Sequence, residues 1–427
     1  MISIILGTQW GDEAKGKLTD YYAQDADIAV RFQGGNNAGH TIVVGDDTFK
    51  LRLIPSGVVQ GKDVVLGNGM VIDPSILKEE LDGLRERNVK MGTLFISERA
   101  HVIMPYHKQE DGILEELKGR HKAGTTMRGI GPCYSDKVSR IGIRFVDLID
   151  KQVFMEKLDI AYDIKKKYFA ALGQDILVSK QEIIDSYTQY ADLFRPFVTD
   201  ISVLLNNAEA QGKNILMEGA QATHLDIDFG IYPFNTSSNC IAGGACTGAG
   251  IPPHSIGNIM GIVKAYTTRV GTGPVPTELE DNYGKHLADK GHEFGTVTGR
   301  PRRCGWLDLM LVKYSVMING LDGVFVTKLD VLNGLDTVKI CVGYTVDGKP
   351  VDYLPSNMET FAKCVPVYKE FKGWDFDLDT VVEKGFDALP KEAKEYLSFI
   401  ETELGVDLFG VSVGPERSMT LVLKQLF

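Results

Sequence analysis

The first residues of the chain combine a glycine-rich turn with two lysines and an acidic side chain. Residues 2–6 form a short apolar run, and residues 11–17 then fit the G-x-x-x-x-G-K spacing of a P-loop. Glycines let backbone N–H groups converge on an anion, and the start of a helix adds partial positive charge. Leu18 stands where a P-loop places a magnesium-binding Ser or Thr, whereas Asp12 lies inside the loop. We therefore predict a nucleotide-phosphate site in which a carboxylate contacts the phosphates or their metal and takes part in the chemistry.

A second glycine-rich turn, residues 31–41, follows another apolar run and carries His40. Ligands bind at the turns beyond the carboxyl ends of strands in an open parallel sheet. If the two preceding strands are neighbours, Asp12 and His40 suit a base and an acid that act across one substrate. Taken alone, His40 is more commonly a turn residue whose ring is satisfied locally, so the hypothesis depends on the two loops meeting.

A third motif, Thr327-Lys328-Leu329-Asp330, follows an apolar run at residues 323–326. It matches the T/N-K-x-D pattern with which many GTP-binding proteins recognise guanine. The aspartate accepts hydrogen bonds from N1–H and the 2-amino group of guanine, a donor pair that adenine lacks, and the lysine stem packs over the base. The alternative is a strand-to-helix turn with Asp330 as the N-cap. Beside a phosphate loop, the pattern favours guanine.

An arginine-rich loop spans residues 295–303, with Arg300, Arg302 and Arg303 among glycine and threonine. A guanidinium group binds a carboxylate through two hydrogen bonds, so we predict a loop that closes on a carboxylate substrate. The alternative is a solvated basic loop. Three further loops carry hydroxyl, amide or arginine groups that suit phosphate and base recognition, although each alone is more often structural: residues 122–132, with Arg140 beyond them, 218–221 and 235–239.

The composition restricts the class of protein. The chain has 427 residues, 44% of them hydrophobic and 24% charged, as in an ordinary globular protein. Its net charge of −11 argues against a protein that coats nucleic acid, so positive charge must gather locally to bind phosphates. Scattered cysteines without C-x-x-C spacing indicate reduced thiols, and no run approaches the ~18 apolar residues of a membrane span. We expect a cytoplasmic protein that contacts neither nucleic acid nor membrane.

The chemical motifs lie between apolar, β-branched runs that alternate with helical stretches such as residues 73–87 and 307–318. This alternation predicts an α/β fold with a large, mainly parallel central β-sheet flanked by helices. We expect one domain over residues 1–427, with a helical insertion of three helices at about 151–212. Asp347-Gly348 predicts a small hairpin, and residues 391–404 form an amphipathic helix. The predicted strands are residues 2–6, 27–32, 63–66, 93–97, 214–217, 259–263 and 323–327, and the hairpin joins residues 338–346 and 351–353.

With these motifs in view, the chain resembles the adenylosuccinate synthetase family of purine biosynthesis nearly from end to end. The resemblance implies GTP-dependent ligation of IMP and L-aspartate to adenylosuccinate, through a 6-phosphoryl-IMP intermediate and with release of GDP and phosphate. This reaction is the first committed step of AMP synthesis from IMP. The resemblance also implies Mg2+ as the cofactor and a homodimer. The motifs that carry it are residues 7–13, 34–41, 129–132, 218–221, 232–239, 298–302, 327–330 and 412–415.

The resemblance also implies roles for individual residues. Asp12 takes the proton from N1 of IMP and binds Mg2+ together with the Gly39 carbonyl. His40 acts as the acid, Lys15 neutralises phosphate charge, and Arg140 reaches the IMP site of the partner subunit. The residues implied in GTP binding are Gly11, Asp12, Glu13, Ala14, Lys15, Gly16, Lys17, Gly39, His40, Thr41, Arg302, Lys328, Leu329, Asp330, Ser412, Val413 and Gly414. Those implied in IMP binding are Asp12, Lys15, Asn37, Ala38, Gly39, His40, Thr126, Arg140, Gln221, Thr236 and Arg300, and those implied in aspartate binding are Thr296, Val297, Thr298, Gly299, Arg300 and Arg302.

Three positions depart from the family pattern. Ala14 and Ala222 stand where glycine is usual, and Pro301 interrupts an arginine run. If position 14 needs a positive φ, alanine there costs on the order of 1 kcal/mol. Two other functions share some of the motifs. A regulatory GTP switch needs neither the loop that carries His40 nor an arginine-rich loop, and a nucleotide kinase would not consume aspartate.

Overall fold

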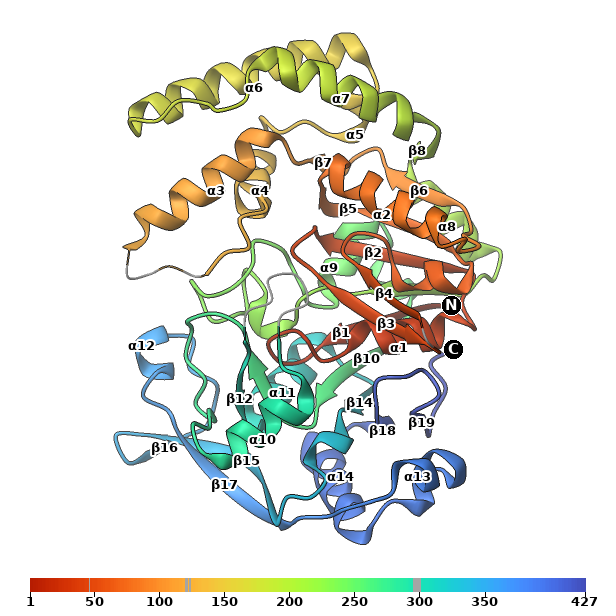
Figure 1. Cartoon of the computed structure of the whole chain (residues 1–427), viewed down its shortest axis with the longest axis vertical. Helices are drawn as coiled ribbons and strands as arrows, with labels where there is room; N and C mark the ends of the chain where they lie inside the picture. Colours follow the sequence, from red (N-terminus) through yellow and green to blue (C-terminus); the bar gives the residue numbers. More distant parts are fainter. Residues whose placement is uncertain (46, 120–121, 123, 295–300) are drawn as a thin grey trace.

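The computed structural model describes residues 1–427 except 46, 120, 121, 123 and 295–300. Its centre is an 11-stranded sheet, parallel throughout except where β19 pairs with β18 at one edge (Figure 1). The strands follow the order β19-β18-β14-β10-β1-β9-β2-β5-β6-β8, and β7 adds to β5. Their bounds are β1 Ile2–Gly7, β2 Ile28–Gly34, β5 Asp63–Ile72, β6 Leu94–Ser97, β7 His101–Val102, β8 Val198–Thr199, β9 Ile215–Glu218, β10 Ile256–Lys264, β14 Gly323–Thr327, β18 Asp407–Ser412 and β19 Thr420–Val422.

The central strands are buried on both faces. Every residue of β1, β2, β9 and β14 is buried. Such continuous apolar strands are typical of a parallel sheet that helices cover on both sides. All seven predicted strands are confirmed, six of them with shifted ends and β14 with the predicted bounds. β5 runs past the predicted residue 66 because Gly69 and Met70 continue the pairing with β2.

The prediction that the first two strands are neighbours is wrong. β9 lies between them, since Ile2 of β1 and Ile28 of β2 both pair with Ile215. Chain order does not fix sheet order, because the long crossover connections of a parallel sheet allow a later strand to enter between two earlier ones. The three strands run in the same direction, so the loops that carry Asp12 and His40 still reach one edge, with the end of β9 between them.

The helices begin and end close to their predicted positions. α2, Pro74–Glu86, follows the N-cap Asp73, whose side chain accepts a hydrogen bond from a backbone N–H of the first turn. α11, Leu309–Asn319, begins later than predicted because Leu307–Asp308 forms the short strand β13. α14, Lys391–Leu404, matches its predicted bounds.

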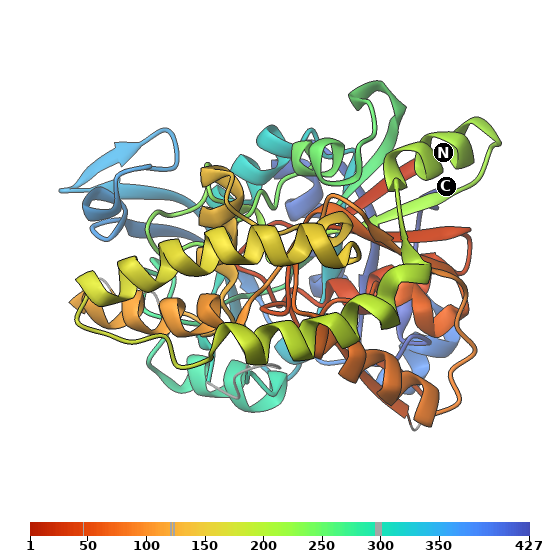
Figure 2. The same ribbon diagram turned by 90° about the horizontal axis from the view of Figure 1, so that it is seen from above.

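The segment expected as a helical insertion contains α6 Lys151–Ala171, α7 Lys180–Phe194 and α8 Ile201–Ala210. α6 and α7 lie side by side on the outside of the molecule (Figures 1 and 2), whereas α8 lies against the sheet. The segment is not purely helical, because β8 lies between α7 and α8 and extends the sheet beside β6. A strand of two residues has no periodicity that a sequence pattern could reveal.

A smaller sheet packs at the opposite end of the molecule from α6 and α7 (Figure 1). It contains the predicted hairpin, which is confirmed by the antiparallel pairing of Val346 with Lys349. All six cysteines are free thiols, and no described helix is long and apolar enough to cross a membrane. The remaining strands are β15 Thr337–Val346, β16 Lys349–Val351 and β17 Val365–Lys372 of this sheet, β3 His40–Val44 paired with β4 Asp47–Leu51, and β11 Thr267–Arg269 paired with β12 Arg303–Gly305.

Candidate active site

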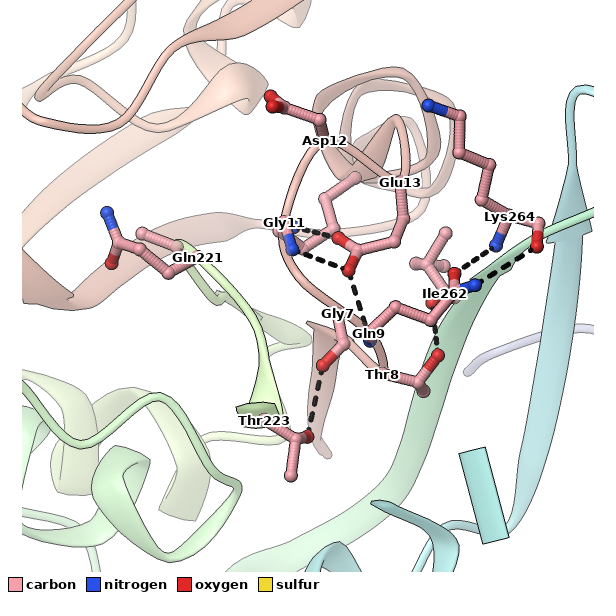
Figure 3. Close-up of polar contacts among 12 residues, drawn as sticks. Gly7, Thr8, Gln9, Gly11, Asp12, Glu13, Gln221, Thr223, Ile262 and Lys264 are labelled. Atoms are coloured by element: carbon pink, nitrogen blue, oxygen red, sulfur yellow. Dashed lines mark hydrogen bonds and ion pairs between the residues drawn. The ribbon is translucent and has the colours of Figure 1, made fainter. Parts of the chain in front are cut away.

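The loop after β1 is shaped by the side chain of Glu13. Its carboxylate accepts hydrogen bonds from the backbone N–H groups of Gln9, at 3.1 Å, and Gly11, at 2.8 Å (Figure 3). It also pairs with Nζ of Lys15 at 2.5 Å, where α1, Lys15–Ala23, begins. Because Glu13 occupies the Gly11 N–H, the loop differs from an ordinary P-loop, in which such groups face the phosphates.

Asp12 points away from Glu13 and lines the cavity described below (Figure 3). Its Oδ2 accepts a hydrogen bond from Nε of Arg302 at 2.9 Å. Although burial opposes its charge, Asp12 and Glu293 together raise the pKa of Arg302 above its ordinary value. A fixed cation therefore links the phosphate loop to the end of the predicted aspartate loop.

His40 is held by a buried carboxylate that the sequence analysis did not single out. Its Nδ1 bonds Oε1 of Glu218, at the end of β9, so Nε2 remains for the cavity. Glu218 also accepts hydrogen bonds from the backbone N–H of Ser56, at 2.6 Å, and from its hydroxyl, at 2.9 Å. Burial alone would raise the pKa of Glu218, but His40, Arg31 and Ser56 hold this pKa below its ordinary value. Burial lowers the pKa of His40 below its ordinary value, and the ionised Glu218 opposes that shift.

The loops open on one cavity of about 770 Å³. It combines the ends of β1, β2 and β14 with segments near residues 124–131, 221–237 and 412–415. The strand β9 that separates β1 from β2 therefore does not separate their loops. The predicted site residues that line it are Gly11, Asp12, Ala14, Lys15, Gly16, Lys17, Asn37, Ala38, Gly39, His40, Thr41, Thr126, Gln221, Thr236, Arg302, Lys328, Asp330, Ser412 and Gly414.

Two side-chain amides, of Gln221 and Asn37, lie on one side of the cavity, and only that of Asn37 donates a hydrogen bond within the described part of the protein. Gln221 adopts a positive φ of 56°, and its Nε2 is buried with no hydrogen-bond partner among the described residues. Nδ2 of Asn37 donates to Oγ1 of Thr236 at 3.3 Å. A buried donor without a partner costs free energy, so Nε2 of Gln221 suits a ligand acceptor in the cavity.

The opposite side of the cavity holds the guanine motif. Lys328 has a φ of 59°, and its Nζ donates to the Gly291 carbonyl at 2.7 Å and pairs with Glu293 at 2.9 Å. Asp330 is not the N-cap of the following turn, because Lys328 takes that position and makes no side-chain cap. Oδ1 of Asp330 is buried and, within the described part of the chain, has no partner. An unpartnered carboxylate oxygen in a cavity suits the donor pair of guanine.

The P-loop spacing predicts that Lys17 contacts phosphates, but its ammonium group donates hydrogen bonds to other groups of the protein. Its Nζ donates to Oγ of Ser412 at 2.6 Å and to the carbonyl oxygens of Gly414 and Met419. Burial lowers the pKa of Lys17 to about 7, although Asp330 and Glu416 oppose the shift. This lysine fixes the segment after β18 against the phosphate loop.

Some predicted site residues lie away from the cavity. Glu13, Leu329 and Val413 are buried and do not line it. Arg140 is exposed at the end of α4, Ile130–Ser139, and does not line this cavity. Thr296, Val297, Thr298, Gly299 and Arg300, from the predicted aspartate loop, lie outside the described residues.

The three departures from the family pattern differ in their backbone. Ala14 has a φ of 66°, so the expectation of a positive φ is confirmed. Ala222 has a φ of −162°, which any residue adopts without strain. Pro301 forms a single β-bridge with Phe294, beside the hydrogen bond from Arg302 N to Glu293 O. Only Ala14 carries the strain that glycine would relieve.

Ala14→Gly is expected to stabilise the protein by about 1 kcal/mol. An L-residue in the left-handed region costs about 1–2 kcal/mol, and the greater freedom of glycine in the unfolded chain offsets about 0.5–1 kcal/mol of the gain. Ala222→Gly is the matched control, because it changes an unstrained alanine, and it is expected to destabilise the protein. Urea unfolding midpoints measure both, and equal shifts in the two variants would contradict the assignment.

The chain matches the family model described as adenylosuccinate synthetase over residues 4–421. It is 51% identical to the adenylosuccinate synthetase of Desulforamulus reducens and 52% identical to that of Carboxydothermus hydrogenoformans, each over 99% of both chains. The chain belongs to the adenylosuccinate synthetase family. A solved structure, fully ligated adenylosuccinate synthetase from Plasmodium falciparum, matches with a TM-score of 0.92 and 40% identity over 99% of each chain.

Membership of the adenylosuccinate synthetase family decides between the functions that the motifs left open. The chain is a ligase of purine biosynthesis, which joins IMP and L-aspartate using GTP and forms adenylosuccinate through 6-phosphoryl-IMP. It is neither a regulatory GTP switch nor a kinase that leaves a phosphorylated nucleotide as its product. The mainly parallel central sheet expected from the resemblance is confirmed.

Proposed function

We propose that Asp12 and His40 are the base and the acid of this ligation. The observation that carries the proposal is that their two loops open on one cavity. Asp12 would take the proton from N1 of IMP, so that the 6-oxygen attacks the γ-phosphate of GTP. His40 would hydrogen-bond the oxygens between the 6-position and the phosphate through Nε2, and Lys15 would neutralise charge. The amino group of aspartate then displaces the 6-phosphoryl group as phosphate. Positioning and charge stabilisation supply most of the catalysis.

The remaining cavity residues would divide among the three substrates. We assign GTP to the side that carries Lys328, Asp330, Ser412 and Gly414, because the unpartnered Asp330 lies there. We assign IMP to the side that carries Asn37, Ala38, Thr126, Gln221 and Thr236, where Nε2 of Gln221 is unpartnered. Arg302 would bind aspartate between them, together with residues 296–300.

The residues around Asp12 fit Mg2+. This ion prefers oxygen ligands and is usually held by one or two carboxylates together with substrate phosphates and water. The Asp12 side chain is 31% exposed, with Oδ2 bonded to Arg302 and Oδ1 left for a cation, and Gly39 lines the same cavity. The described residues hold no cluster of three acidic, histidine or cysteine side chains that could bind a metal, and substrate phosphates and water would complete the coordination. Bound to Asp12 and the Gly39 carbonyl, Mg2+ would neutralise phosphate charge.

The decisive experiment mixes the purified protein with GTP, IMP and MgCl2, with and without L-aspartate. We expect phosphate release and an ultraviolet change that both require aspartate. Phosphate release without aspartate would indicate a GTPase, and a stable phosphorylated nucleotide would indicate a kinase. Either outcome would contradict the proposal.

Glu218→Gln is expected to move the alkaline limb of the kcat profile to lower pH by about one unit. Burial lowers the pKa of His40 below its ordinary value, and the carboxylate of Glu218 opposes that shift. The neutral amide would therefore lower the pKa of His40 further, and the protonated imidazole would be lost earlier as the pH rises. Ser56→Ala is the control, because it removes one hydrogen bond and keeps the charge. An unshifted limb in the glutamine variant would argue against His40 as the acid.

We further propose a cytoplasmic homodimer in which Arg140 completes the IMP site of the partner subunit, each subunit being a single domain with a helical insertion. Arg140→Leu is then expected to raise the IMP KM. Mixed with Asp12→Asn, it should recover about a quarter of wild-type activity, because half the dimers would be mixed and each would hold one intact site. An unchanged IMP KM, or no recovery while subunits exchange, would indicate that Arg140 is only a surface cation.

A further inference from the structure

A completely buried carboxylate, Glu293, holds two of the cations that line the cavity. Its side chain is 0% exposed, and it follows α10, Asn282–Gly291, where it faces the ends of the paired strands β10 and β14. Oε1 pairs with Nζ of Lys264 at 2.8 Å and Nζ of Lys328 at 2.9 Å, and Oε2 pairs with Nη1 of Arg302 at 2.7 Å. Burial alone would raise the pKa of Glu293, but these three cations hold this pKa well below its ordinary value.

The two cavity-lining partners of Glu293 serve different parts of the cavity. Lys328 belongs to the guanine motif, whereas Arg302 lies at the end of the predicted aspartate loop and donates a hydrogen bond to Asp12. The Glu293 carbonyl also accepts a hydrogen bond from Arg302 N at 2.9 Å, so both side chain and backbone fix this arginine. A displacement of Lys328 toward a bound base therefore changes the charge that faces Arg302 through a single carboxylate.

We propose that Glu293 is a positioning residue that couples the binding of GTP to the binding of aspartate. The inference rests on the roles of Lys328 and Arg302 given under the proposed function. One carboxylate holds the two cations on opposite oxygens, so fixing Lys328 over guanine also fixes Arg302 in the orientation that receives the aspartate carboxylate. The substrate that binds first bears the free-energy cost of ordering Glu293, Lys328 and Arg302. The second substrate then binds more tightly than it would to the empty protein.

Glu293→Gln tests the coupling because glutamine keeps the shape but offers only one oxygen acceptor. The amide can hold Lys328 or Arg302, while its NH2 group faces the other cation. The double variant Glu293→Gln/Lys264→Met removes one negative and one positive charge together, so it remains informative if the unbalanced single variant does not fold. Glu80→Gln is the matched control. Glu80 is also buried, but it accepts hydrogen bonds from the backbone N–H groups of Arg52 and Leu53 outside the cavity.

The measurement is the Kd of a non-hydrolysable GTP analogue, with IMP present, at zero and at saturating L-aspartate. In the wild-type protein and in Glu80→Gln we expect aspartate to lower this Kd by about fivefold or more. In the Glu293 variants we expect the ratio to fall below about twofold, while the Kd of IMP measured alone stays near the wild-type value.

The outcomes separate this inference from the proposed function. A wild-type ratio near one, or a wild-type ratio preserved in both Glu293 variants, would overturn the coupling while leaving the ligase reaction intact. Equal weakening of IMP and of the analogue, with the ratio unchanged, would reduce Glu293 to a structural role. Failure of the wild-type protein to release phosphate in response to aspartate would instead overturn the proposed function itself.

Discussion

Asp12→Asn is expected to lower kcat about a thousandfold or more, within the range by which a general base accelerates a reaction. The amide keeps the shape of the side chain but cannot accept the proton from N1 of IMP. The fold should remain intact, because asparagine tolerates the left-handed region that Asp12 occupies at a φ of 60°. Its Oδ1 can also keep the hydrogen bond that Asp12 receives from Arg302. Steady-state kinetics of the purified variant across a pH series measure the effect.

The same substitution at Asp347 provides the control for Asp12→Asn. Asp347 also has a positive φ, 50°, but it is exposed in the turn between β15 and β16 and does not line the cavity. Asp347→Asn is expected to leave kcat unchanged. If Asp12→Asn kept near-normal activity at every pH, another group would have to be the base.

Seven strands of the central sheet could be predicted from the sequence because their apolar runs are continuous and local, whereas β7, β8, β18 and β19 were not predicted. The order of the strands could not be predicted, since β2 ends at Gly34 and β9 begins only at Ile215, and nothing local indicates that β9 enters between β1 and β2. The consequence for the site is small, because parallel strands bring their loops to the same edge whatever their order.

The candidate site could be predicted where glycine or a short motif surrounds the chemical group, as at Asp12, His40 and Asp330. Glu218 begins the motif at residues 218–221 but ends a buried strand, and Glu293 follows a helix outside every motif, so the sequence assigns neither carboxylate a role. Their importance comes from partners far away in the chain, such as His40 for Glu218. Lys17 shows the opposite case, in which a local motif predicts the wrong partner. Its spacing predicts a phosphate contact, whereas its Nζ donates a hydrogen bond to Ser412, 395 residues away.

Asp330→Asn is expected to reverse the preference of the enzyme for GTP over XTP. Oδ1 of Asp330 is buried without a partner among the described residues, and the side chain lines the cavity beside Lys328. Guanine would donate N1–H and its 2-amino group to this carboxylate. Asparagine keeps one oxygen acceptor, and hydrogen bonds to a charged group contribute about 1.5–3 kcal/mol each, so losing one should weaken GTP binding by about one to two orders of magnitude.

Xanthine carries a carbonyl where guanine carries the amino group, so the NH2 of asparagine donates where the carboxylate accepted. The variant should therefore bind XTP more tightly than the wild-type protein does and bind GTP more weakly. Asp330→Ala is the control, because it removes both acceptors and adds no donor, and it should weaken GTP without improving XTP. Competition between GTP and XTP at fixed IMP and aspartate measures the ratio of kcat/KM values. A variant that kept its full preference for GTP would show that base recognition lies elsewhere in the cavity, and the unpartnered oxygen of Asp330 would then need another donor.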